Sequence, residues 1–201
     1  RFTILILLLP LGLFAQDKAQ SIELNEQLTG INSRRLTTNK RGMWTLGSWA
    51  VANIGLGLVM RAQTQGVDRA FWTMNAGWNT VNLALAGFGL YGAYTGSAEL
   101  GLAKTNAELQ SIQQLLLFNA GLDVGYMATG MWLRERGKRN LKHAERWTGW
   151  GNALLIQGGF LLAFDLVMAW RHHRTAKALD PLFDQLELSV GAGGMGLAYV
   201  F

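Results

Sequence analysis

The sequence predicts an all-α membrane protein with four transmembrane helices, arranged as two parallel helical-hairpin repeats and followed by a short C-terminal β-hairpin. Three observations predict this class. Four apolar segments are each long enough to cross a bilayer, aromatic residues lie beside charged residues at their ends, and one sequence motif occurs twice. Half of the 201 residues are hydrophobic and 15% are charged, against about 25% charged in soluble domains.

Composition excludes several classes of protein. The chain has no Cys, which rules out disulfides, zinc ribbons, iron–sulfur ligation and thiol catalysis. The net charge of +5 is compatible with nucleic acid in principle, but the basic residues cluster beside apolar segments. That placement is typical of membrane flanks, so we expect membrane lipid as a partner and no nucleic acid.

The N-terminus is typical of an export signal. Residues 1–16 read RFTILILLLPLGLFAQ, a basic residue followed by a 13-residue apolar run that is shorter than the ~20 residues of a membrane span. We predict a signal peptide over 1–15 with cleavage after Ala15. An anchor that stays attached is the alternative. Residues 16–42 are polar and are expected to form a short, partly helical lead-in.

The transmembrane domain is predicted over 43–171. Between residues 43 and 60, and again between 70 and 98, there is no charged side chain. A soluble bundle would instead place charges every third or fourth position along each helix. The expected spans are 43–61, 71–95, 112–133 and 147–170.

The repeated motif reads GWNTVNLALAGFGLY at 77–91 and GWGNALLIQGGFLLAF at 149–164. Aligning Trp78 with Trp150 also matches Gly87 with Gly159. One helix earlier, ANIGLG at 52–57 resembles FNAGLD at 118–123. A duplicated two-helix unit explains this pattern, and an even number of spans per unit makes the two copies parallel.

Orientation follows from the signal segment, because the basic residues do not decide it. An exported N-terminus places loops 61–70 and 134–146 in the cytoplasm, and the two sides then carry eight and nine Lys and Arg residues. We expect a bacterial inner-membrane protein with periplasmic N- and C-termini. Outer-membrane association is the less favoured placement.

The tail, residues 172–201, has a different pattern. Alternation in LELS and in LAYVF flanks the glycines of 191–196, which is typical of a β-hairpin. A single hairpin cannot close a barrel. We therefore expect a small ribbon that docks on the helices or on a partner.

Polar side chains inside the spans are the candidate functional residues. Asn75, Asn79 and Asn82 share one helical face, and every span carries at least one Asn. Such groups must find hydrogen-bond partners away from lipid. A packing network between helices is one interpretation, and a polar cavity for an ion, proton or small solute is the other. The full cluster is Asn53, Asn75, Asn79, Asn82, Asn119, Asp123 and Asn152.

Asp123 is the strongest candidate in this cluster. It lies near the middle of its span, where an ionised carboxylate costs ~2.5–3.5 kcal/mol or more, and the only basic residue within the span bounds is Arg61, at the very end of the first span. We expect it to be protonated, or hydrogen-bonded by Asn side chains and Tyr126. Asp165 lies nearer a segment end, within expected reach of water or Arg171.

Nothing in the sequence supports catalysis. His143, His172 and His173 all fall outside the spans, which excludes transmembrane haem ligation, and no HExxH, GxSxG or phosphate-loop motif occurs. The pair His172-His173 is interpreted as a basic flank at the membrane surface. We predict no catalytic residue, no metal and no cofactor.

The signal ending LFAQ, the four Asn-containing spans and the Gly-rich tail that closes on Phe resemble a family of small, uncharacterised four-helix membrane proteins from Bacteroidota. The resemblance implies the architecture and transfers no activity. The expected function is that of a non-enzymatic integral membrane protein that assembles with itself or with an envelope partner. The alternative is a small transporter or channel-like protein that uses the Asn/Asp cluster.

Overall fold

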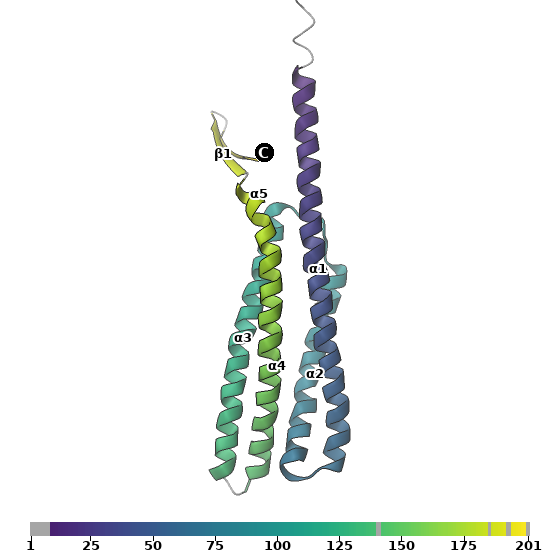
Figure 1. Cartoon of the computed structure of the whole chain (residues 1–201), viewed down its shortest axis with the longest axis vertical. Helices are drawn as coiled ribbons and strands as arrows, with labels where there is room; N and C mark the ends of the chain where they lie inside the picture. The colour runs from purple at the N-terminus through teal and green to yellow at the C-terminus, as the bar shows by residue number, and fades with distance from the viewer. Residues whose placement is uncertain (1–8, 140–141, 185, 192–193, 200–201) are drawn as a thin grey trace, which may run out of the picture.

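The computed structural model contains four long helices that run side by side (Figure 1). It describes residues 9–139, 142–184, 186–191 and 194–199, with side chains for 21–139 and 142–184. Each long helix contains one of the predicted apolar segments, so the prediction of a bundle of four helices is confirmed. The helices are α1 (Leu9–Gln63), α2 (Gly66–Thr95), α3 (Leu102–Arg139) and α4 (Ala144–Ala176).

The first helix is longer than the sequence analysis expects. At 55 residues, α1 runs unbroken through the predicted lead-in, and its N-terminal part extends beyond the bundle (Figure 1). The expectation of a partly helical lead-in is therefore wrong: residues 16–42 are helical throughout. The helix is held there because Leu28, Ile31 and Leu36 recur on one face and are buried. The signal peptide stays a prediction, and its residues 1–8 lie outside the described part of the chain.

The helices pair as two hairpins. The principal contacts join α1 to α2 and α3 to α4, and α2 packs on α4 to hold the hairpins together. Both hairpins turn at the same end of the bundle (Figure 1). The first turn is short, and Gly66 begins α2 with φ of 58°, a left-handed conformation that favours glycine. Shared direction is what parallel hairpin repeats require.

The chain beyond α4 continues at the other end of the bundle (Figure 1). A 3₁₀ turn, η1 (Lys177–Leu179), leads into the short helix α5 (Asp180–Asp184). The strands β1 (Leu186–Gly191) and β2 (Gly194–Tyr199) then pair antiparallel, with Leu186 opposite Tyr199. Ala192, Gly193, Val200 and Phe201 of the predicted ribbon lie outside the described residues.

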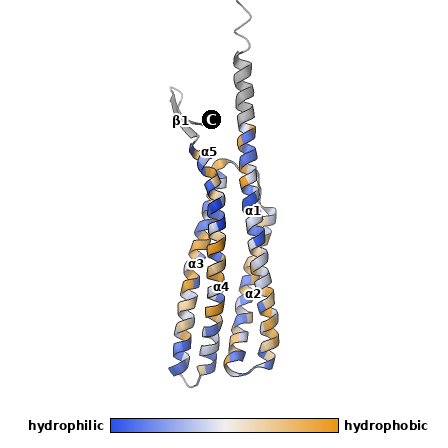
Figure 2. Cartoon of the chain, in the orientation of Figure 1, coloured by the Kyte–Doolittle hydropathy of each residue, from blue (hydrophilic) through white to orange (hydrophobic). Residues whose placement is uncertain are grey.

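The bundle has two zones with opposite polarity. At the end that carries η1 and α5, Leu28, Ile31, Leu109, Leu179 and Leu182 form a conventional apolar core. We call this zone the head. Along the rest of the four helices, which we call the body, the fully buried side chains include Asn75, Asn79 and Gln157, while large apolar side chains face outward. Figure 2 shows hydrophilic residues along the head part of α1 and hydrophobic residues along its body part.

Only two of the helical segments that the structure describes are long and apolar enough to cross a membrane by length and composition. They are Ser21–Gln63, within α1, and Ala144–Asp184, which contains α4. The prediction of four such segments is therefore supported for α1 and α4 alone. The polar side chains within their apolar segments lower the hydropathy of the other two helices, through three buried asparagines in α2 and through amides and Asp123 in α3.

Candidate functional site

Hydrogen-bonded asparagines connect α1, α2 and α4 inside the body. Asn75 Nδ2 donates to Asn53 Oδ1 at 2.9 Å and joins α2 to α1. Asn79 Nδ2 donates to the Asn75 carbonyl oxygen at 2.8 Å, and Asn82 Nδ2 donates to Asn79 Oδ1 at 3.3 Å. Because Asn75 and Asn79 are fully buried, these bonds replace the water that their amides lose.

Gln157 on α4 completes this network, and the sequence analysis does not single it out. Its Nε2 donates to Asn75 Oδ1, and its Oε1 accepts a bond of 3.0 Å from Trp49 Nε1. The Trp49 ring stacks on Phe160 with centroids 3.9 Å apart. One fully buried carboxamide therefore links the first hairpin to the second.

A cavity of about 180 Å³ lies beside this network, and all four long helices contribute to its lining. The cavity has room for about six waters at ~30 Å³ each. Asn82, Asn119 and Asp123 line it together with Asp165. The rings of Trp78 and Tyr126 meet edge to face at its wall, with centroids 4.7 Å apart. The structure thus divides the predicted cluster, because Asn53, Asn75 and Asn79 belong to the bonded network and Asn119 and Asp123 to the cavity.

The partner of Asp123 differs from the expectation. Its carboxyl group lies beside that of Asp165 on α4, and both line the cavity together with Tyr126. Asp165 is buried against this cavity, and among the described residues it forms no ion pair with Arg171, which the sequence analysis places within its reach. A hydrogen bond between two carboxyl groups requires a proton on one of them. Asp123 Oδ2 is buried and has no hydrogen-bond partner among the described residues.

Asn152 lies apart from both groups. It is half-buried on α4, away from the hydrogen bonds described above. Two asparagines that the repeat alignment matches also have different surroundings in the structure. Asn53 binds within the network whereas its counterpart Asn119 lines the cavity.

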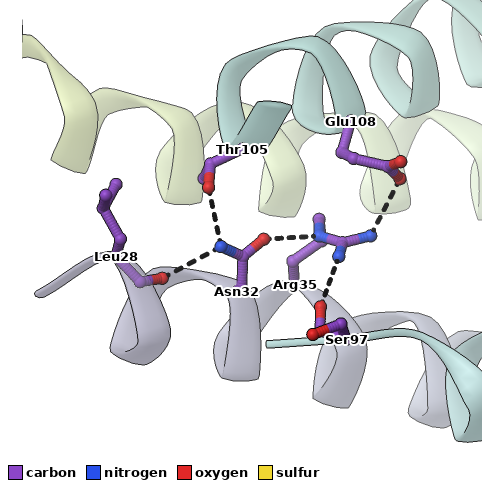
Figure 3. Close-up of polar contacts among 6 residues, drawn as sticks. All are labelled: Leu28, Asn32, Arg35, Ser97, Thr105 and Glu108. Carbon is purple, nitrogen blue, oxygen red and sulfur yellow. Dashed lines mark hydrogen bonds and ion pairs between the residues drawn. The ribbon is translucent and has the colours of Figure 1, made fainter. Parts of the chain in front are cut away.

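A second polar cluster fastens α1 to α3 in the head (Figure 3). Asn32 Nδ2 donates to Thr105 Oγ1 at 2.7 Å and to the Leu28 carbonyl oxygen at 3.0 Å. Arg35 Nε donates to Asn32 Oδ1 at 3.1 Å, and Arg35 Nη1 forms an ion pair with Glu108 at 3.1 Å. The Arg35 guanidinium also reaches the Ser97 carbonyl oxygen. Helical spacing of Asn32 and Arg35 with Leu28 was the available signal for this packed face.

His172 is buried in the head, so the expectation of a basic surface flank is wrong for it, although His173 is exposed. Neither ring nitrogen of His172 has a hydrogen-bond partner among the described residues. Burial, followed by the positive charges of Arg35 and Arg171, lowers the pKa of His172 to about 4. The imidazole is therefore neutral at pH 7.

Aromatic rings and arginines form a belt where the two hairpins turn. The Arg136 guanidinium lies 5.2 Å from the Trp132 ring centroid and 5.1 Å from that of Trp147. Arg146 lies over Trp150 at 5.2 Å. At the other end of the body, Lys40 lies over Tyr94 at 4.5 Å and Arg174 over Trp170 at 5.0 Å. Cations on amphipathic rings at both ends match the two interfaces of a bilayer.

Within the described residues, no group of three or more His, Cys, Asp or Glu side chains could hold a metal ion. Among the described residues that line the cavity, Asp123 and Asp165 are the only acidic ones. The cavity therefore offers acceptors and aromatic faces to a ligand rather than a metal-ligand set.

A family model matches residues 45–166, and the chain belongs to that family, a family of unknown function (DUF6992). The matched segment runs from the body part of α1 to Leu166 on α4, so it includes the asparagine network and the cavity. No protein of curated function and no solved structure matches the chain. The expected kinship with an uncharacterised family is confirmed, while its placement among membrane proteins of Bacteroidota stays a prediction.

Proposed function

We propose that this chain is a non-enzymatic integral membrane protein whose four-helix body spans the bilayer and which acts by assembling with itself or with an envelope partner. One observation carries the proposal. The body buries carboxamides and exposes large apolar side chains, as shown by buried Asn79 and Gln157 and by Val81, Phe88 and Phe118 with 60%, 76% and 65% of their surface exposed. In water this arrangement loses the hydrophobic effect of the exposed apolar side chains, whereas in lipid these side chains meet an apolar solvent and the asparagine network stays hydrogen-bonded inside the bundle.

The spacing of the aromatic residues supports the same placement. Trp147 and Trp170 lie about 35 Å apart along α4 at a rise of about 1.5 Å per residue. A hydrocarbon core of about 30 Å fits between them. The head, with its leucine core and charged surface, then lies in water beside one membrane face. We propose that this is the periplasmic face of the inner membrane, with the β1–β2 ribbon and both termini on the same side.

Assembly is supported by an outward face of α3. Gly121 and Gly125 are exposed, and a Cβ added at either would meet nothing within 4 Å. Their GxxxG spacing permits close approach of a second helix in lipid. The glycines at the α3–α4 contact differ, because atoms of α4 already occupy the space that a Cβ at Gly130 would need.

Cross-linking tests assembly directly because the chain has no native Cys. Gly125→Cys should form disulfide-linked dimers on mild oxidation in native membranes. The matched control is Val59→Cys, which places a thiol on the exposed surface of α1 and should stay monomeric. Monomers with both variants would contradict self-assembly through α3, and release of the protein by carbonate at pH 11 would contradict membrane integration.

The cavity favours a second function, that of a small transporter or channel-like protein. Asn82, Asn119 and Asp123 line an open volume instead of satisfying one another. A pure packing network would leave no such volume. Counterflow of a bound solute across sealed vesicles that contain the purified protein would distinguish this function from assembly alone.

A further inference from the structure

We propose that the cavity beside Asp123 and Asp165 is a binding site for a small protonated amine with an apolar body. This inference rests on the membrane placement proposed above and names the class of ligand for its interior site. It requires neither transport nor self-assembly. Three features carry it, namely the charge of the carboxyl pair, an unused acceptor atom and the character of the walls.

The charge of the pair calls for one positive charge. One proton between Asp123 and Asp165 leaves a single negative charge on the two carboxyl groups. None of the described residues lining the cavity is Lys, Arg or His. An uncompensated charge is costly inside a low-dielectric bundle. A monovalent cation in the cavity would neutralise the pair without moving its proton.

The unused acceptor calls for a hydrogen-bond donor. Asp123 has only 3% of its surface exposed, and its Oδ2 lacks a partner within the described residues. A buried carboxylate oxygen left unpaired costs more free energy than an unpaired neutral group does. An ammonium N–H supplies the missing bond, and the carboxamides of Asn82 and Asn119, which also line the cavity, can accept others.

The walls call for an apolar, polarisable ligand. Trp78, Tyr126 and Phe164 line the cavity together with leucines. Aromatic faces attract an organic cation and the leucines accommodate its carbon skeleton. A hydrated metal ion gains little from such walls and prefers six or more oxygen ligands. The cavity volume of about 180 Å³ limits the ligand to the size of a cyclic amine of six or seven carbons.

The test uses the full chain in lipid nanodiscs, with cyclohexylammonium as probe and cyclohexanol as its neutral counterpart. Calorimetric titration should show one saturable cyclohexylammonium site per chain and at least tenfold weaker binding of cyclohexanol. Asp123→Asn and Asp165→Asn should each weaken binding at least tenfold. The exposed carboxylate of Asp68, on α2 outside the cavity, provides the control, and Asp68→Asn should bind like the wild type.

A series of ligands on the wild-type protein keeps the test decisive even if a variant misfolds. Tetrabutylammonium, which is bulky and has no N–H, should fail to compete, and so should sodium in equimolar amount. Absent saturable binding, equal affinity for cyclohexanol, or displacement by equimolar sodium would each overturn the proposal. Membrane integration is scored separately by carbonate extraction. An integrated protein without amine binding defeats this inference alone, and amine binding by an extractable protein defeats the proposed membrane placement alone.

Discussion

Gln157 donates a hydrogen bond to Asn75, and this contact joins α4 of the second hairpin to α2 of the first inside the body. Both side chains are almost fully buried, and each has a second partner, Trp49 for Gln157 and Asn53 for Asn75. Hydrogen bonds of this kind orient helices in lipid, where the hydrophobic effect does not drive them together. The contact therefore specifies how α2 sits on α4.

Replacing Gln157 should weaken the bundle measurably. Gln157→Leu leaves Asn75 Oδ1 and Trp49 Nε1 with fewer partners, and we expect the free energy of unfolding to fall by about 1–2 kcal/mol. The double variant with Asn75→Leu should cost less than the sum of the two single variants, as measured by denaturant titration in detergent. Gln110→Leu, at an exposed position of α3, is the control and should stay within ~0.5 kcal/mol. Strict additivity would show that the contact contributes nothing specific.

Two glycines set the distance between α3 and α4. A Cβ on Gly151 would lie 2.5 Å from the Gly130 carbonyl oxygen, and one on Gly130 would lie 2.8 Å from the Gly151 carbonyl oxygen. Because backbone atoms cannot move aside easily, Gly130→Ala and Gly151→Ala should each lower the free energy of unfolding by about 1–3 kcal/mol. Gly121→Ala, in open space, should be neutral or stabilising. Equal midpoints for Gly121→Ala and Gly151→Ala would contradict the close α3–α4 contact.

Acid should destabilise the head through His172. Its pKa is lowered to about 4 in the folded chain from its ordinary value of 6.5. Between these pH values the unfolded chain binds a proton that the folded chain does not, so the free energy of unfolding falls as pH drops from 6.5 to 4. The loss should total about 3 kcal/mol. Thermal midpoints between pH 7 and pH 4 should fall less steeply for His172→Gln than for the wild type, and parallel slopes would refute the assignment.

The head depends on Arg35. Arg35→Met removes the ion pair to Glu108 and leaves Asn32 Oδ1 without its donor, and we expect a loss of about 2 kcal/mol because Glu108 remains partly hydrated. Limited proteolysis should then cut α1 between residues 21 and 42 faster. Arg34→Met changes the exposed neighbouring arginine and should leave the cleavage rate unchanged. The same rate in both variants would exclude a clamping role for Arg35.

The four helices of the body could be predicted because long apolar runs bounded by charges leave few alternatives. The head could not, although its pattern was present. Residues 16–42 are polar on average, and the buried set Leu28, Ile31 and Leu36 is visible only when the segment is considered as one face of a helix. The mean composition of this segment does not show the helical spacing of its apolar residues, and that spacing is what places them in the core.

The sequence predicts which polar residues face the interior, but it does not predict which of them meet across the helices. Helical spacing put Asn75, Asn79 and Asn82 on one inward face, and the structure buries all three. Asp165 lies 42 positions beyond Asp123 on another helix, so their meeting depends on the register of α3 against α4, which close glycine contacts set. The burial of His172 is not predictable from its sequence neighbours for a similar reason. Its neighbours Arg171, His173 and Arg174 suggested a wet surface, whereas the turn of α4 directs His172 alone into the head.

Cysteine accessibility in native membranes tests the four-span body most directly, because α2 and α3 are the helices whose composition alone does not predict a span. Val81→Cys and Val124→Cys place thiols on their exposed mid-helix surfaces, and Glu99→Cys and Lys138→Cys place them at opposite ends of the bundle. A charged maleimide applied to broken membranes should modify positions 99 and 138 and reach 81 and 124 only after solubilisation in SDS. Modification of 81 and 124 at the rate of 99 and 138 in intact bilayers would show that α2 and α3 lie in water, and the transmembrane body would be wrong.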